Sequence, residues 1–216
     1  MDADRIPLKA IIFDAGDIFL RPNYEKATIA KERLFSFLKS HLIHENALDD
    51  NLQIIWKKLV KFGLSSQKTI THDTGFGIPI SLIENIEIAQ WWKNLDLHSK
   101  DLFKYLSHEG YKLGILTDSI LLPSKIREFL EGFAHYVQAI VSSREVGATK
   151  PDPLMYQTIM TKLDIKEPAR CLFVGHDPEE LEGAEKFGFF TVDLLDHNDS
   201  LLQLKKFIKE TYQFER

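Results

Sequence analysis

From residue 110 onward, short runs rich in β-branched and aromatic residues alternate with stretches typical of helices. The strand-like runs are YKLGILT, HYVQAIVSS, RCLFVG and GFFTVDLL, and the helical stretches are PSKIREFLEGF, PLMYQTIMTKL and PEELEGAEKF. Strands that alternate with helices predict βαβ units and a mostly parallel sheet. PLKAIIFDA, near the N-terminus, has the continuous apolar character of one more buried parallel strand.

A long segment with a different pattern of apolar and polar residues follows this first strand. From about Pro22 to about Leu97 the sequence carries almost no strand signal. One apolar stripe at helical spacing consists of Leu48, Leu52, Ile55, Leu59 and Phe62. EKATIAKERLFSFLKSHL and SLIENIEIAQWWKNL are two further helical stretches, and THDTGFGIP is a loop broken by Gly and Pro.

These two residue patterns predict two domains within the 216 residues. Residues 1–20 and 98–216 are expected to form an α/β core, and residues 21–97 a small all-helical domain inserted after the first strand. The hydrophobic fraction of 44% and the charged fraction of 27% are ordinary for a globular chain with a buried core.

Charge and cysteine content limit the expected partners and compartment. The net charge is −5, and no run of Lys and Arg forms a basic stripe, so nucleic acid is not an expected partner. The single Cys171 cannot form an internal disulfide, and the N-terminus has no secretory signal pattern. No apolar run approaches the roughly 18 residues of a membrane span. We therefore expect a cytoplasmic protein with no membrane partner.

Polar residues follow each predicted strand at its carboxyl end, which is the edge where open parallel sheets bind ligands. In chain order these residues are Asp14, then Thr117, Asp118 and Ser119, then Lys150 in REVGATKP, and finally His176, Asp177 and Glu180. A strand-end carboxylate can attack phosphorus or carbon. A hydroxyl and an ammonium can hold oxyanion oxygens, and acidic residues can hold a divalent metal.

With these residues in this order, the chain resembles the haloacid dehalogenase superfamily along nearly its whole length. FDAGDIF is similar to the first family motif, ILTDS to the second, EVGATKPDPLMY to the third and FVGHDPEELEGAEKFG to the fourth. The resemblance implies a Rossmann-like core, with the helical insertion as a cap that closes over the site and selects the substrate. For most members it also implies phosphoryl transfer with Mg²⁺ on a small phosphorylated molecule.

The resemblance implies a role for each matching residue. Asp14 is the nucleophile, Thr117 orients the transferring group, and Lys150 positions Asp14 and stabilises developing charge. The residues expected to line the substrate site are Gly16, Asp17, Arg21, Asp118 and Ser119. The residues placed to hold a metal are Asp14, the carbonyl of Gly16, His176, Asp177 and Glu180.

The first departure from the family pattern is at Gly16. Phosphatases of the family place a second Asp there, which protonates the leaving oxygen and later deprotonates water. Asp17 is one residue too late, because adjacent side chains of an extended or tightly turned backbone point to different sides. General acid–base catalysis contributes about 10²- to 10⁴-fold, so its loss is expected to matter least for acyl phosphates and other good leaving groups.

The second departure is at His176, where the fourth motif usually reads Gly-Asp. Mg²⁺ prefers hard oxygen ligands, so an imidazole in place of a carboxylate should weaken its binding. His176 is then a ligand for a softer metal, a proton donor, or a hydrogen-bonded loop histidine. Asp177, just before Pro178, is also well placed to cap the following helix.

Three functions are compatible with this pattern. The first is a phosphatase-type hydrolase with an aspartyl-enzyme intermediate at Asp14. The second is a catalytically impaired member that keeps the fold to bind a ligand or another protein. The third is a metal-independent, dehalogenase-like enzyme, for which Arg21 is placed to serve as the cap arginine near the halide.

Overall fold

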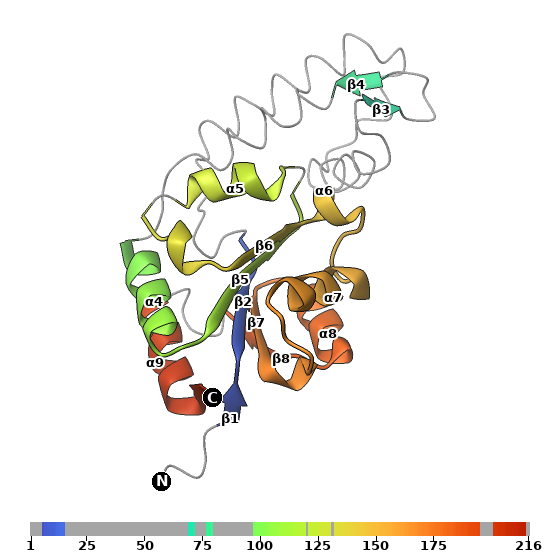
Figure 1. The fold of residues 1–216 in the computed structure, drawn as a ribbon. Coiled ribbons are helices and arrows are strands. Elements are labelled where there is room, and N and C mark those ends of the chain that lie inside the picture. Colours follow the sequence, from blue (N-terminus) through green and yellow to red (C-terminus); the bar gives the residue numbers. More distant parts are fainter. Residues whose placement is uncertain are drawn as a thin grey trace.

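Five parallel strands form the central sheet (Figure 1). The structure is a computed structural model, and it describes residues 6–15, 69–71, 77–79, 97–119, 121–130, 132–194 and 201–214. In spatial order the strands are β6 (Ala139–Ser142), β5 (Lys112–Thr117), β2 (Ala10–Phe13), β7 (Cys171–Gly175) and β8 (Phe190–Asp193). Every neighbouring pair is parallel. The predicted parallel sheet is therefore confirmed, with the first strand at its centre.

Helices cover both faces of this sheet, as Figure 1 shows. One face packs against α4 (Leu97–His108), α5 (Pro123–Phe129) and α9 (Leu201–Thr211). The other face packs against α7 (Pro153–Lys162) and α8 (Pro178–Phe187). Three short elements complete the core: α6 (Ser143–Val146) and the 3₁₀ turns η2 (Ala134–Tyr136) and η3 (Pro168–Arg170). The α/β fold class inferred from the sequence is thus the observed one.

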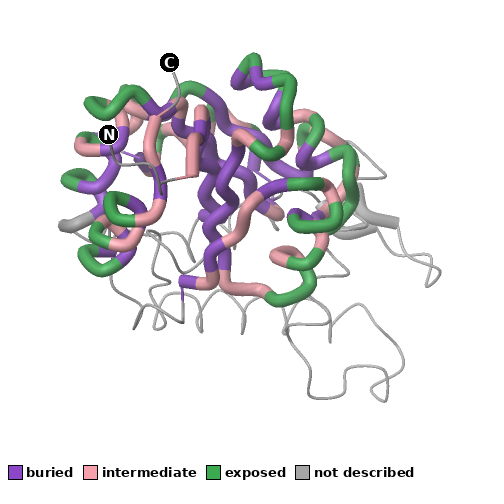
Figure 2. The backbone as a smooth tube through the Cα atoms, turned by 90° about the horizontal axis from the view of Figure 1, so that it is seen from below, coloured by how far each residue is buried: buried purple, intermediate pink, exposed green. Residues whose placement is uncertain are grey.

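Strand β2 shows why a continuous apolar run suits a central strand. Consecutive side chains of a strand point to opposite faces. Ile11 and Phe13 belong to the hydrophobic cluster beneath α4 and α9, while Ala10 and Ile12 belong to the cluster beneath α7. All four residues are fully buried, and Figure 2 shows the buried backbone gathered at the centre of the molecule. With both faces covered, a single polar residue in this strand would face one of the two clusters.

Helices α7 and α8 begin with the same N-terminal cap, an Asp followed by Pro. The carboxylate of Asp152 accepts a hydrogen bond from the backbone N–H of Leu154 at the start of α7. Asp177 accepts one from the N–H of Glu179 at the start of α8, so its predicted capping role is confirmed. Both helices have proline at the first helical position, where the missing N–H costs nothing.

The N-terminal apolar run is divided between two sheets. β1 (Ile6–Leu8) pairs in parallel with β9 (Tyr212–Phe214), whereas β2 joins the central sheet. The division falls at Lys9, whose N–H donates to the carbonyl of Arg170 and whose carbonyl accepts from the N–H of Lys112. The sequence predicts one strand here because both pieces are apolar.

The inserted segment contains a short antiparallel pair, β3 (Thr69–Thr71) with β4 (Gly77–Pro79). This pair is a local correction to the prediction of an all-helical domain. Its physical basis is the β-branched run Thr-Ile-Thr, which favours extended backbone but is too short to stand out in the sequence. The three predicted helices of this segment lie outside the described residues, so the domain division at 21–97 stays a prediction.

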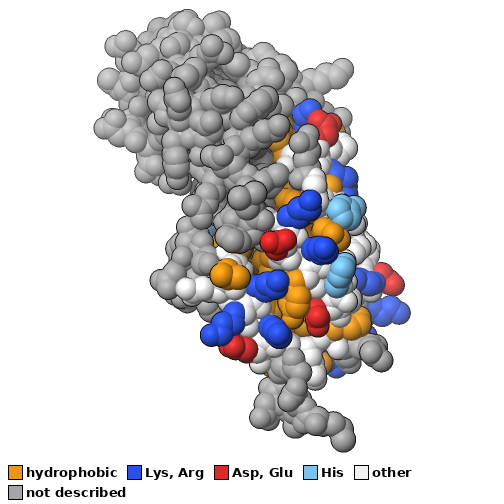
Figure 3. Space-filling view, turned by 90° about the vertical axis from the view of Figure 1, so that its left-hand side faces the viewer, with side chains coloured by type: hydrophobic (Ala, Val, Ile, Leu, Met, Phe, Trp, Pro, Cys, Tyr) orange, Lys and Arg blue, Asp and Glu red, His pale blue; other side chains and the backbone are white. Residues whose placement is uncertain are grey.

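The outer faces of α4 and α9 are rich in charged side chains (Figure 3). The exposed lysines on these two helices are Lys100, Lys104, Lys206 and Lys209. Their inward faces carry Leu102, Leu106, Leu204 and Ile208, all buried. This division is the one expected of helices that pack on a sheet by one side only. Among the described residues, no helix has both the length and the apolar character needed to cross a bilayer.

Candidate active site

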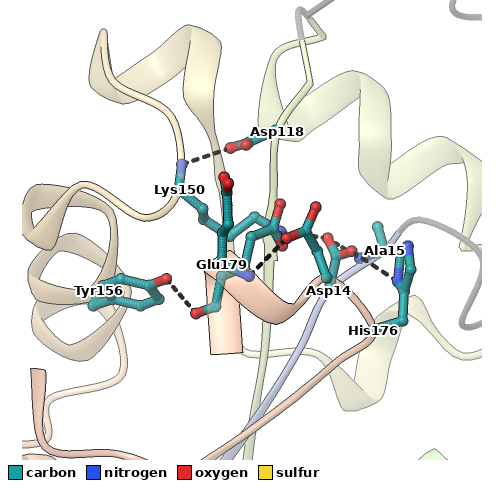
Figure 4. A network of polar contacts seen from close by, with 9 residues as sticks. Asp14, Ala15, Asp118, Lys150, Tyr156, His176 and Glu179 are labelled. Carbon is teal, nitrogen blue, oxygen red and sulfur yellow. Dashed lines mark hydrogen bonds and ion pairs between the residues drawn. The ribbon is translucent and has the colours of Figure 1, made fainter. Parts of the chain in front are cut away.

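The residues predicted to be catalytic, and His176 from the predicted metal set, lie at the carboxyl end of the central sheet. Asp14 directly follows β2, Thr117 is the last residue of β5, and His176 follows β7. Lys150 arrives from the loop between α6 and α7 (Figure 4). The register of the sheet places these strand ends side by side, because Phe13 pairs with Ile115 on one side and Val174 on the other.

Asp14 is buried, with 5% of its surface exposed, and its carboxylate is held at one oxygen. Oδ1 accepts hydrogen bonds from the N–H of Ala15 at 2.8 Å and from Nζ of Lys150 at 2.7 Å. Its own N–H donates to the carbonyl of Val174 at 2.9 Å. Oδ2 lies 3.7 Å from Nδ1 of His176, which is longer than a hydrogen bond. One carboxylate oxygen is therefore fixed, and the other faces the loop that follows β7.

Lys150 is the cation at the centre of the site. Its ammonium is buried and pairs with Asp14 at 2.7 Å and with Oε2 of Glu180 at 2.6 Å. Burial by itself lowers the pKa of Lys150, but the negative charges of Asp14, Glu180 and Asp118 outweigh it, so the pKa is raised above its ordinary value. Lys150 is therefore a permanent positive charge beside the nucleophile position.

Glu180 lies in the first turn of α8 and completes this ion-pair cluster. Burial raises its pKa from 4.5 to about 7, although the charge of Lys150 opposes the change and that of Asp14 adds to it. The backbone carbonyl of Glu180 accepts a hydrogen bond of 2.8 Å from the hydroxyl of Tyr156 (Figure 4). Tyr156 thus ties α7 to the turn of α8 that presents Glu180 to Lys150.

Comparisons with known proteins identify the family of this chain. The family model for haloacid dehalogenase-like hydrolases matches residues 8–188. The chain belongs to the haloacid dehalogenase-like hydrolase family. A search of solved structures finds the HAD phosphatase from Thermococcus onnurineus at a TM-score of 0.60 and 18% identity, with 94% of this chain and 99% of that one covered. At that identity the likeness supports the fold alone.

Two relatives of this haloacid dehalogenase-like chain carry phosphatase names. Phosphatase MT3486 of Mycobacterium tuberculosis (strain CDC 1551 / Oshkosh) is 38% identical over 81 residues, which are 37% of this chain and 36% of that protein. Glyceraldehyde 3-phosphate phosphatase of Methanopyrus kandleri is 28% identical over 88 residues, 40% of this chain and 37% of that protein. The matched segments thus span little more than a third of each relative.

The described side chains near Asp14 offer few hard oxygen ligands for Mg²⁺. Among the described residues, no three His, Cys, Asp or Glu side chains are placed to hold a metal ion together. Glu180 is paired with Lys150, and Asp177 caps α8 through the N–H of Glu179. The remaining candidate near Asp14 is His176, which offers nitrogen, whereas Mg²⁺ requires hard oxygen ligands in a near-octahedral shell. Among the described side chains, the Mg²⁺ that the family resemblance implies would therefore depend mainly on Asp14, and the carbonyl of Gly16, the other predicted oxygen ligand, lies outside the described residues.

Asp118 and Ser119, predicted to line the substrate, support the loops of this haloacid dehalogenase-like site. Asp118 Oδ1 accepts a hydrogen bond of 3.0 Å from the backbone N–H of Lys150. Ser119 Oγ accepts one of 3.0 Å from the N–H of Leu121, and the Ser119 carbonyl accepts from the hydroxyl of Ser143. These bonds join the loops after β5 and β6. Substrate contact by either side chain stays a prediction.

Other residues of the predicted site are only partly placed. Thr117 is buried at the end of β5, beside Ser142 of β6. Gly16, Asp17 and Arg21 lie outside the described residues, and their roles stay predictions. The sequence does not single out Tyr156, because a tyrosine in the first turn of an apolar helical stretch is most simply a core residue. Its position in the third motif, just after DPLM, was the available signal.

Proposed function

We propose that this chain is a hydrolase of small phosphorylated metabolites that acts through an aspartyl-enzyme intermediate at Asp14. The observation that carries the proposal is the pairing of Asp14 Oδ1 with the buried ammonium of Lys150 at 2.7 Å. A permanent cation holds a strand-end carboxylate in one orientation, which is what a carboxylate nucleophile needs. The phosphatase names of two partial relatives support the same reaction class.

In this proposal the two oxygens of Asp14 have different tasks. Oδ1 is occupied by Lys150 and the N–H of Ala15, so Oδ2 attacks the phosphorus. The bond from Oδ2 to phosphorus forms as the bond to the leaving oxygen breaks, and the leaving group departs as an anion that takes a proton from water only if it is strongly basic. Water then attacks the phosphorus, frees Asp14 and releases inorganic phosphate. Lys150 stabilises the charge at both steps, and Thr117 contacts the transferring group.

Gly16 stands where phosphatases of the family have their acid–base Asp. Without that group the reaction depends more strongly on how readily the leaving group departs. Acyl and aryl phosphates need little protonation of the leaving oxygen, whereas alkyl phosphates need it most. The preferred substrates are therefore phosphorylated metabolites with acidic leaving groups, such as acyl phosphates.

The test is turnover of acetyl phosphate and p-nitrophenyl phosphate by the wild type, Asp14→Asn and the surface control Asp101→Asn. We expect both substrates to be turned over by the wild type and the control, and turnover to fall at least about 10³-fold in Asp14→Asn. The wild type should hydrolyse both substrates faster than it hydrolyses an alkyl phosphate. Full activity in a folded Asp14→Asn protein would sink the proposal.

A second candidate is a member of the family that binds an anion without turning it over. It is favoured by the two substitutions in the family pattern, Gly16 and His176. Binding of inorganic phosphate with no turnover of any phosphoester would select it. Release of chloride from a 2-haloacid in the presence of a chelator would instead select the dehalogenase-like alternative.

A further inference from the structure

The carboxylates around the nucleophile already face donors from the protein itself. Oδ1 of Asp14 and Oε2 of Glu180 share the ammonium of Lys150, at 2.7 Å and 2.6 Å. Oδ1 of Asp177 accepts from the N–H of Glu179 at 2.9 Å and so serves the start of α8. One oxygen of each of these acidic side chains is therefore engaged by an ammonium or by an N–H group.

Oδ2 of Asp14 faces an imidazole. Nδ1 of His176 lies 3.7 Å from it, and the His176 side chain is 30% exposed. The separation is too long for a hydrogen bond, so the imidazole lies beside Oδ2 without a direct hydrogen bond to it. A group bonded to Oδ2 would lie next to this nitrogen.

We infer that Lys150 and His176 serve Asp14 in place of a divalent cation, so that the site takes a tetrahedral oxyanion of the phosphate class without Mg²⁺. This inference rests on the proposed function, since it concerns the same nucleophile. Lys150 supplies the fixed positive charge from one side of the carboxylate. His176 supplies a hydrogen-bonding nitrogen on the other side, toward the oxygens of the bound anion.

The direct test is metal binding, measured without reference to activity. Mn²⁺ is titrated into the wild type, His176→Asp and the control His108→Asp, and free Mn²⁺ is followed by electron paramagnetic resonance. We expect no saturable Mn²⁺ binding by the wild type. The control should behave in the same way, because His108 lies at the exposed end of α4. His176→Asp restores a carboxylate beside Asp14 and should bind one Mn²⁺ at least about tenfold more tightly than the wild type.

Calorimetric titration of the wild type with Mg²⁺ and Zn²⁺ makes the result independent of how well the variant folds. Saturable Mg²⁺ or Mn²⁺ binding by the wild type, lost in Asp14→Asn, would overturn the inference. Zn²⁺ binding lost in His176→Asn would also overturn it, because His176 would then be a metal ligand. No binding of any of these ions by the wild type supports it.

A separate measurement distinguishes this inference from the proposed function. Inorganic phosphate and orthovanadate are titrated into the wild type in EDTA and again in Mg²⁺. Equal affinity in the two buffers, weakened in His176→Ala, supports a site built from protein donors. Anion binding that appears only with Mg²⁺ contradicts the inference and leaves the hydrolase proposal standing. If the wild type binds anion in EDTA but turns over no phosphoester, the hydrolase proposal fails and the inference stands.

Discussion

The ammonium of Lys150 lies 2.7 Å from Asp14 and 2.6 Å from Glu180, and it joins two carboxylates that come from opposite ends of the chain. Lys150 and Asp14 are 136 residues apart in the sequence. The segment after β2, the loop before α7 and the first turn of α8 therefore converge on one buried cation. The pairing orients the nucleophile, and it also means that the loss of any member leaves an unmatched charge in the protein interior.

Replacing Lys150 with Met should therefore destabilise the fold as well as end catalysis. The change leaves Asp14 and Glu180 buried and facing each other, which typically costs about 3–5 kcal/mol for a broken buried pair. Urea unfolding of wild type and variant measures this cost. Glu180 should then take up a proton more readily, because the charge of Lys150 lowers its pKa in the wild type.

Lys162→Met is the matched control for this change. Lys162 pairs with Glu145 at 2.6 Å, but both side chains are about one-third exposed. Exposed pairs contribute about 0–1 kcal/mol, so this variant should unfold close to the wild type. An equal loss of unfolding free energy in the two variants would show that the Lys150 cluster contributes no more to stability than an exposed ion pair.

Tyr156→Phe tests how α8 is held against the site. The substitution keeps the ring, which packs on Phe173, Phe187 and Phe189, and removes the hydrogen bond to the Glu180 carbonyl. We expect a loss of about 1 kcal/mol in unfolding free energy. Turnover should fall with little change in KM, because the effect reaches Lys150 through Glu180 and touches no substrate.

The control for this change is Tyr136→Phe, in the η2 turn on the other side of the sheet. Tyr136 is only partly buried and stacks on His135, a contact that Phe retains. This variant should match the wild type in stability and in turnover. A Tyr156→Phe protein that also matches the wild type in both measurements would rule out the positioning role of Tyr156.

The core and the convergence of Asp14 and Lys150 were predictable from the sequence because both depend on local patterns. Apolar runs define the parallel strands, and Asp-Pro at residues 152–153 and 177–178 marks the starts of α7 and α8. In a parallel sheet, strand ends meet at one edge whatever the distance in sequence. The sequence therefore places the two residues together before any contact is known.

Other features depend on long-range pairing that no local pattern carries. β1 and β9 are three residues each, and their register is set by partners from opposite ends of the chain. The role of Asp118 toward the backbone of Lys150 depends on how two loops approach each other. The C-terminal helix α9 did carry a signal, since Leu201, Leu204 and Ile208 recur at spacings of three and four and are buried together.

Gly183→Ala should destabilise the protein, against the usual direction for a helix. Alanine normally stabilises a helix interior relative to glycine by roughly 0.5–1 kcal/mol. At Gly183 of α8, however, a Cβ would overlap Cβ of Pro151 and lie 3.0 Å from the hydroxyl of Tyr156. We expect a net loss of about 1–3 kcal/mol in thermal or urea unfolding, as for other overpacked sites.

The exposed neighbour Glu182 provides the control for this prediction. Glu182→Ala changes the same helix turn without adding an atom to the interface with Pro151, and its surface pair with Lys186 contributes little. Its unfolding free energy should stay close to that of the wild type. A Gly183→Ala protein more stable than the wild type would mean that α7 and α8 can move apart at no cost.

The contribution of Glu180 to stability should fall as pH rises from 4.5 toward 7, because burial raises its pKa from 4.5 to about 7. Between these values the folded chain holds a proton on Glu180 that the unfolded chain has released, so each rise in pH favours unfolding. Glu180→Gln cannot titrate, and its unfolding free energy relative to the wild type should increase across this window. Glu109→Gln, at an exposed position just after α4, is the matched surface control. Urea unfolding at a series of pH values measures both differences, and a wild type that gains stability relative to Glu180→Gln as pH rises would show that Glu180 is held as a carboxylate by Lys150 throughout.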